Sequence, residues 1–170
     1  KLIIKNNSIS LNRFINLCLY EKQEGYYHNK QIGSDFITSP EVSQMFGECI
    51  SIFFISLMEK LNVSNFCELG PGKGTLANDI IRCMSKIKEK NIKFFLYEKS
   101  SFFDHKKISN FKKIKVYNMK NFKMEKKPYF FICNEFFDAL PINQIKKIRG
   151  DFFEKRITIK ENKIVPFYKK

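Results

Sequence analysis

A glycine-rich segment at residues 66–76, FCELGPGKGTL, carries the strongest chemical signal in the sequence. Gly70, Gly72 and Gly74 follow an apolar run and precede a helix-forming segment, and Glu68 stands two residues before the first glycine. Glycine is favoured in such a turn because it adopts positive φ without steric penalty and leaves room for a ligand. The layout is typical of a strand-to-helix turn whose backbone passes close to a nucleotide-like cofactor.

The spacing of the glycines separates the cofactor classes. A dinucleotide fingerprint reads G-x-G-x-x-G and a P-loop reads G-x-x-x-x-G-K-[ST], whereas here the spacing is G-x-G-x-G and Lys73 is followed by Gly74. Glu68 disfavours an anionic ligand and suits the sulfonium and ammonium groups of S-adenosyl-L-methionine. The pattern therefore predicts this cofactor, bound by Glu68 and by the loop Gly70-Pro71-Gly72 with Gly74. A turn that merely connects strand and helix is the alternative.

Two more polar residues follow apolar runs that are typical of strands. Glu98 comes directly after 92–97, and a carboxylate at that point can accept hydrogen bonds from both hydroxyls of a ribose. Asn118 follows 114–117 and could bind the edge of an adenine. We therefore predict that Glu98 and Asn118 bind the cofactor. A surface glutamate and an ordinary loop asparagine are the alternatives.

The segment Asn134-Glu135-Phe136-Phe137-Asp138 is the second strong signal. Polar groups that emerge from an apolar strand among aromatic residues are costly unless they are paired. Asn134 offers a carbonyl acceptor, and Glu135 and Asp138 offer two carboxylates that could hold a guanidinium by charge-assisted hydrogen bonds. We therefore predict that these three residues are catalytic. In the alternative, Asp138 caps a helix and Glu135 is solvated.

These residues are placed by elements that alternate along the chain. The apolar spacing predicts helices over Ser8–Tyr20, from Thr38–Glu41 to Leu61, and over Thr75–Lys90, and strands over Val63–Leu69, Ile92–Tyr97, Ile114–Tyr117 and Tyr129–Cys133. Two short strands are expected between Asp151 and Ile164, with a turn at Glu161-Asn162. Apolar strands separated by helices indicate an α/β fold with a mostly parallel sheet and helices on both faces. Ligands of such sheets bind at the carboxyl ends of the strands.

Composition limits the classes of partner. The net charge is +14, but only four of the 31 basic residues are arginine, and the lysines are spread along the chain without interleaved aromatic residues. Nucleic acid stays open as a partner and is not favoured. The five cysteines stand singly, which indicates a reducing compartment and no zinc site. The most apolar run, Cys49–Met58, is too short to span a membrane, so no insertion is expected.

Three blocks of the sequence resemble the signatures of the MidA/NDUFAF7 family of S-adenosyl-L-methionine-dependent methyltransferases: Gly25–Glu48, Glu68–Leu76 and Asn134–Gln144. The resemblance implies a class I methyltransferase fold and, for mitochondrial members, dimethylation of arginine on a complex I subunit during assembly. It places Thr38-Ser39-Pro40-Glu41 over the cofactor, so Thr38 and Ser39 join the predicted cofactor-binding residues. A helix cap without a ligand is the alternative. The resemblance also implies the mitochondrial matrix in a eukaryote or the cytoplasm in a bacterium.

The resemblance also implies a division of the chain. Residues 1–170 are expected to form one incomplete methyltransferase domain, with a helical lead-in over 1–62, a Rossmann-like core over 63–150 and the start of a β-hairpin insertion over 151–170. Family members are much longer, so the later strands and much of the cap on the substrate side are expected to lie outside this sequence. The oligomeric state is not predicted.

The predicted reaction is an in-line displacement that transfers the methyl group to a guanidinium nitrogen. Glu135 and Asp138 would orient the guanidinium, and one of them would accept the proton that it loses; no metal is required. Three other functions stay open: methylation of a nucleic-acid or small-molecule amine, a non-catalytic assembly factor with the same fold, and a nicotinamide oxidoreductase, which the glycine spacing disfavours.

Overall fold

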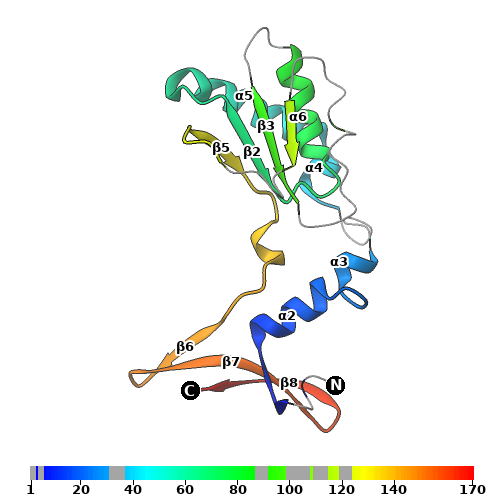
Figure 1. Cartoon of the computed structure of the whole chain (residues 1–170), viewed down its shortest axis with the longest axis vertical. Coiled ribbons are helices and arrows are strands. Elements are labelled where there is room, and N and C mark those ends of the chain that lie inside the picture. The colour runs from blue at the N-terminus through cyan, green and yellow to red at the C-terminus, as the bar shows by residue number, and fades with distance from the viewer. Residues whose placement is uncertain are drawn as a thin grey trace. The chain divides into compact units, whose positions relative to one another are not determined.

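The computed structural model of the 170-residue chain describes residues 3, 6–30, 37–86, 92–98, 108, 115–118 and 124–170. For 115–118 it describes the backbone alone. The chain forms two compact units (Figure 1). One is Gln31–Phe137, and the other combines Lys1–Lys30 with Asp138–Lys170. The domain limits expected at 62/63 and 150/151 stay a prediction.

The unit Gln31–Phe137 contains a four-stranded parallel sheet. Its strands are β2 (Asn65–Leu69), β3 (Lys93–Tyr97), β4 (Lys115–Asn118) and β5 (Tyr129–Ile132), in the order β4-β3-β2-β5. All neighbouring pairs are parallel, so the carboxyl ends of the strands meet at one edge. The predicted parallel sheet is confirmed. β2 begins two residues later than expected because Asn62 ends the preceding helix in the left-handed conformation, with φ 50°.

The helices α5 (Gln44–Leu61) and α6 (Thr75–Lys86) pack on each other and on this sheet (Figure 1). The core is aromatic where the strands are in register: Phe66 of β2 pairs with Phe94 of β3 and with Phe130 of β5. The ring of Phe54 on α5 lies 5.1 Å from that of Phe66 and 5.0 Å from that of Phe130. This core fixes the direction of β2 and therefore the position of the loop that follows it. The last four residues predicted for α6, 87–90, lie outside the described residues.

The predicted start of the long helix is wrong by several residues. Thr38 and Ser39 begin only one turn, α4 (Ser39–Val42), and the side chain of Thr38 makes no capping hydrogen bond. The chain is extended at Ser43, whose hydroxyl accepts a hydrogen bond from the backbone N–H of Met45 at 3.2 Å and so begins α5. A serine that satisfies a free N–H group is a strong N-cap. The predicted single helix is therefore divided at Ser43 into α4 and α5.

The second unit contains an antiparallel sheet built on one long strand. β7 (Asp151–Lys160) pairs with β1 (Ile9–Ser10), β6 (Ile145–Ile148) and β8 (Lys163–Lys169). β8 pairs with Glu154 to Lys160; within this range Glu154 also pairs with β6, and Arg156 and Ile157 also pair with β1. A strand has two edges, so β6 and β1 lie end to end along one edge of β7, and β8 lies along the other. The predicted strands at 151–164 are confirmed, whereas β1 and β6 were not predicted.

The turns of this sheet have the backbone expected of two-residue hairpins. Glu161 and Asn162 have φ 48° and 60°, and Arg149 and Gly150, between β6 and β7, have φ 48° and 91°. Positive φ at both central residues matches the twist of the flanking strands. The predicted turn at Glu161-Asn162 is therefore confirmed.

The first helix of this unit, α2 (Leu11–Tyr20), starts three residues later than predicted, because Ser10 caps it and Ile9–Ser10 pair with β7 instead. A short helix α3 (Tyr26–Asn29) follows. The end of the 3-10 helix η3 (Phe137–Ala139) and the residues after it are joined to α2 by two hydrogen bonds. These run from Tyr20 Oη to Ala139 O at 2.8 Å and from Asn12 Nδ2 to Pro141 O at 3.0 Å. None of the helices in the described ranges is long and apolar enough to cross a membrane.

Candidate active site

The glycine loop leaves the parallel sheet at the carboxyl end of β2. Gly70, Gly72 and Gly74 all have positive φ, at 69°, 57° and 85°. The N–H of Gly70 donates to the carbonyl of Tyr97 at the end of β3 at 2.8 Å, and the N–H of Gly74 donates to the carbonyl of Pro71 at 2.7 Å. The left-handed conformation favours glycine at each position. The expectation that this turn needs positive φ is therefore confirmed.

Gly70 is also a point of close approach. A Cβ at this position would lie 2.6 Å from Cδ2 of Phe136. The ring of Phe136 therefore packs directly on the glycine loop. The contact joins the two strongest sequence signals, the loop at 70–74 and the segment that begins at Asn134, within the unit Gln31–Phe137.

Glu68 is buried at the end of β2, with 2% of its surface exposed, and its buried Oε2 has no hydrogen-bond partner among the residues that the structure describes. Burial, and then the nearby charge of Glu98, raises the pKa of Glu68 to about 8. A buried acceptor without a partner costs about 1–3 kcal/mol. Glu68 can therefore accept one more hydrogen bond, and a cationic donor would interact with it more strongly than a neutral one.

Glu98 lies next to the loop, one residue beyond β3. It is 8% exposed, and its Oε2 accepts a hydrogen bond from the N–H of Gly72 at 3.2 Å. In the registers of the sheet Glu68 is opposite Leu96, and Leu96 is opposite Asn118. Glu68 and Asn118 therefore lie at the ends of β2 and β4, and Glu98 follows β3, at the same edge of the sheet. The sequence predicted this edge, but it placed Asn118 one residue beyond its strand instead of at the strand's last position. The side chain of Asn118 is outside the described part.

Glu41 of α4 was missed as a site residue by sequence reasoning. Its Oε1 accepts from Thr75 Oγ1 at 2.6 Å, and its Oε2 lies 3.1 Å from Lys73 Nζ. The hydrogen bond from Thr75, with a smaller contribution from Lys73, lowers the pKa of Glu41. These contacts tie the segment that contains Thr38 and Ser39 to the glycine loop. The spacing of Thr38 and Glu41 had indicated a capping box, which hid this second use of the carboxylate.

The predicted catalytic residues follow β5. Asn134 is half-buried, and Glu135 is exposed with φ 50°, an uncommon conformation for a residue other than glycine. Asp138 is exposed in η3 and belongs to the other compact unit. The structure therefore brings Glu68, Glu98 and the glycines together, and the grouping of Asp138 with Asn134 and Glu135 stays a prediction. Among the described residues, no group of three or more His, Cys, Asp or Glu could hold a metal ion.

Comparisons with known proteins agree with this geometry. Residues 49–168 match a family described as "Putative S-adenosyl-L-methionine-dependent methyltransferase". The chain is 32% identical over 186 residues to the mitochondrial protein arginine methyltransferase NDUFAF7 of Xenopus laevis, an alignment that covers 89% of the chain and 42% of that protein. It is 29% identical over 187 residues to the Drosophila melanogaster homolog, covering 92% of the chain and 43% of the homolog.

A solved structure is also similar. It is a COG1565 superfamily member and likely methyl transferase from Burkholderia thailandensis bound to S-adenosyl-homocysteine. The TM-score is 0.78 at 18% identity, over 99% of this chain and 47% of that one. The similarity confirms the α/β fold.

The chain spans less than half of the length of these relatives. Within that span the family match covers both the glycine loop and the segment after β5. The predicted family and its cofactor class are therefore confirmed. The chain belongs to the MidA/NDUFAF7 family of S-adenosyl-L-methionine-dependent methyltransferases.

Proposed function

We propose that this chain provides the cofactor-binding part of a protein arginine methyltransferase that uses S-adenosyl-L-methionine. The observation that carries the proposal is the buried carboxylate of Glu68 at the mouth of a glycine loop, whose Oε2 has no partner in the described part of the chain. A site with two adjacent buried carboxylates and closely approaching backbone fits a ligand with an ammonium group, a ribose and no phosphate. The relatives that carry the name protein arginine methyltransferase support the reaction.

The roles of the cofactor-binding residues follow from their chemistry. Glu68 accepts from the ammonium group, and Glu98, already held by the N–H of Gly72, accepts from the ribose hydroxyls. Gly70, Gly72 and Gly74 let the backbone approach, with Pro71 buried between them. Thr38, Ser39 and Asn118 complete the proposed set. The bound cofactor supplies a methyl group on a positively charged sulfur.

The acceptor residues belong to the segment after β5. A free guanidinium has a pKa above about 12, so its nitrogens are poor nucleophiles in water. Glu135 and Asp138 hold the guanidinium by charge-assisted hydrogen bonds, with Asn134 as a further acceptor. Holding the charge away from the attacking nitrogen favours transfer, and one carboxylate accepts the proton that is lost. Orientation of the acceptor supplies much of the rate.

The partner and the compartment are also part of the proposal. The relatives carry mitochondrial in their names, and we place this protein in the mitochondrion, with the matrix as its compartment. Its substrate is then an arginine-bearing protein, and the family resemblance favours a subunit of respiratory complex I.

Calorimetric titration with S-adenosyl-L-methionine and with S-adenosyl-homocysteine tests the cofactor part. We expect binding by the unaltered chain, a loss of about tenfold or more in affinity for Glu68→Gln, and no change for Glu24→Gln, which alters an exposed glutamate in a turn. Failure of the unaltered chain to bind either ligand would overturn the proposal.

A methyl-transfer assay then compares an arginine-bearing protein with nucleic acid. Glu135→Gln is expected to keep the affinity for the cofactor and to lose transfer. Methylated nucleic acid together with unmodified protein would reverse the assignment of the substrate.

A further inference from the structure

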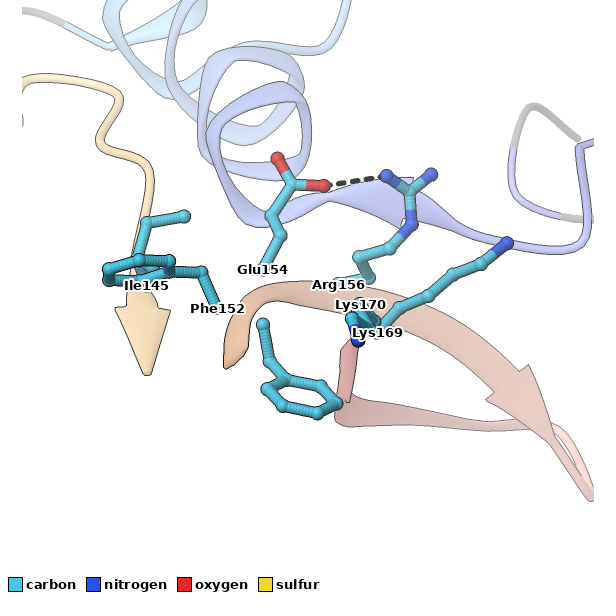
Figure 2. Close-up of a pocket in the computed structure, with 7 residues that line it drawn as sticks. Ile145, Phe152, Glu154, Arg156, Lys169 and Lys170 are labelled. Atoms are coloured by element: carbon cyan, nitrogen blue, oxygen red, sulfur yellow. Dashed lines mark hydrogen bonds and ion pairs between the residues drawn. The ribbon is translucent and has the colours of Figure 1, made fainter. Parts of the chain in front are cut away.

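A pocket of about 400 Å³ opens on the antiparallel sheet of the second unit. Ile145, Phe152, Glu154, Arg156, Lys169 and Lys170 line it (Figure 2). They come from β6, β7 and the end of β8, within the unit formed by Lys1–Lys30 and Asp138–Lys170. None of them belongs to the cofactor site at the glycine loop, so the pocket needs an explanation of its own.

The apolar part of the pocket is exposed. Ile145 is 54% exposed and Phe152 is 64% exposed. The register places Ile145 opposite Glu154 and Lys147 opposite Phe152, so these four side chains belong to one face of the sheet. Two large apolar side chains together on a solvent-exposed face are a feature of interaction sites.

The acidic groups around the pocket are already paired. Glu154 and Arg156 form an ion pair, drawn as a dashed line in Figure 2, with 2.7 Å between Oε2 and Nη1. Asp151 Oδ1 lies 2.8 Å from Lys170 Nζ. Arg156 also donates to the hydroxyl and carbonyl of Ser8. Neither Lys147 nor Lys169 makes an ion pair with a described residue. Residues 145–170 contain nine basic and three acidic residues, so the surplus charge is positive.

The arrangement favours protein over nucleic acid as the partner. The ammonium of Lys147 lies 5.5 Å from the centre of the Phe152 ring, and that of Lys146 lies 5.7 Å from the centre of the Tyr168 ring. Nucleic-acid bases would need such ring faces for stacking. Arg156, the lining residue best suited to a phosphate, is committed to Glu154 and Ser8.

We infer that this pocket binds an extended acidic segment of a partner protein, with an apolar side chain of that segment against Ile145 and the edge of the Phe152 ring, and its flanking carboxylates on Lys147 and Lys169. The apolar contact gives the segment its register on the sheet. The lysines supply attraction that weakens as salt rises. This binding requires no methyl transfer and goes beyond the proposed function.

Fluorescence anisotropy with a labelled peptide of glutamate and glycine around one central leucine tests the inference. The control peptides replace each glutamate by glutamine, or the leucine by serine, and oligothymidylate of equal charge serves as a nucleic-acid competitor. We expect the acidic peptide to bind at least about fivefold more tightly than either control peptide, with affinity that falls as salt is added. Equal binding of the glutamine peptide, or tighter binding of oligothymidylate at the same residues, would overturn the inference.

Variants locate the contact. Lys147→Glu with Lys169→Glu should weaken binding by about tenfold, and Phe152→Ser by about fivefold. Lys169→Glu alone should weaken binding measurably, whereas Lys163→Glu, the same single charge reversal at the other end of β8, should change affinity less than about twofold. All these side chains lie at exposed positions, and circular dichroism checks that the variants fold. Equal losses for Lys169→Glu and Lys163→Glu would contradict a local site. Sedimentation that shows a dimer broken by Phe152→Ser would identify a second copy as the occupant and also contradict it.

Discussion

At the scale of single residues, Glu68 has the most consequence for the proposed function. Its carboxyl is buried beside Glu98, and one of its oxygens has no partner among the described residues. With a pKa raised to about 8, it is neutral in the cofactor-free protein at pH 7. A neutral acid costs less free energy to bury than a carboxylate does. In the proposed site, a bound cationic ligand would favour the ionised form of Glu68 and so offset the cost of burying its charge.

The stability of the chain should depend on pH through Glu68. Below about pH 4.5 the carboxyl is protonated in the folded and the unfolded state, and above that value the unfolded state ionises first. The contribution of Glu68 to the free energy of unfolding is therefore lost as pH rises toward about 8. Urea unfolding should show Glu68→Gln gaining stability over the unaltered chain by up to about 1.4 kcal/mol per pH unit in this range. A difference that does not change with pH would contradict the assignment.

The contact between Gly70 and Phe136 gives a second prediction at this scale. Gly70→Ala combines positive φ with a Cβ placed 2.6 Å from the ring, whereas Gly150→Ala has positive φ and nothing within 4 Å. We expect Gly150→Ala to cost about 1 kcal/mol of unfolding free energy and Gly70→Ala about 2–4 kcal/mol. Adding Phe136→Ala should recover part of the excess. Equal costs in both glycine variants would show that the ring moves aside freely.

At the scale of elements, much of the fold can be predicted from the sequence where one local signal dominates. Apolar runs such as the one ending at Leu69 have no competing use, and the turn at Glu161-Asn162 lies between two alternating strands. The break at Ser43 could not be predicted, because the sequence offers possible N-caps both at Thr38-Ser39 and at Ser43. Local sequence alone does not tell whether one helix or two will form between them. β1 is two residues long, and its strand character comes entirely from β7.

The same reasoning applies to the candidate site. The glycine loop and the two glutamates could be predicted because their chemistry is local to strand ends. Glu41 could not, because its contacts with Lys73 and Thr75 join segments more than thirty residues apart.

A substitution at Gly47 of α5 tests how closely this helix packs on α6. Alanine is favoured over glycine inside a helix by about 1 kcal/mol. At Gly47, however, a Cβ would lie 2.6 Å from the Cβ of buried Asp79. We expect Gly47→Ala to lower the free energy of unfolding by about 1–3 kcal/mol, because the two helices must move apart. Cys49→Ala, at an exposed position of α5, should be neutral or slightly stabilising in the same denaturant titration. A more stable Gly47→Ala protein would mean that the helices separate at no cost.

At the scale of the whole molecule, the proposed cofactor site and the acidic-segment pocket belong to different compact units. Glu68, the three glycines and Glu98 all lie in Gln31–Phe137, whereas the acidic-segment pocket lies in the other unit. The second unit is discontinuous in sequence, so β7 holds together the two ends of the chain.

Hydrogen exchange should detect this division. S-adenosyl-homocysteine is expected to slow exchange at Gly70–Gly74 and along β2 by about tenfold or more at saturating ligand, because bound ligand stabilises the structure that it contacts. Amides of β7 and β8 should exchange at an unchanged rate. Equal protection in β7 would show that the two units open together.

The position of β7 also has a consequence for the order in which the newly made chain can fold. Ile9 pairs with Ile157, so β1 has no partner until about 150 further residues have been made, roughly 7–30 s later at about 5–20 residues per second. The four strands of the parallel sheet all precede Asn134, so they can pair with one another before β7 has been made. β1 and the apolar face of α2 therefore wait longer for their partner strand, and we expect a chaperone to bind them during synthesis.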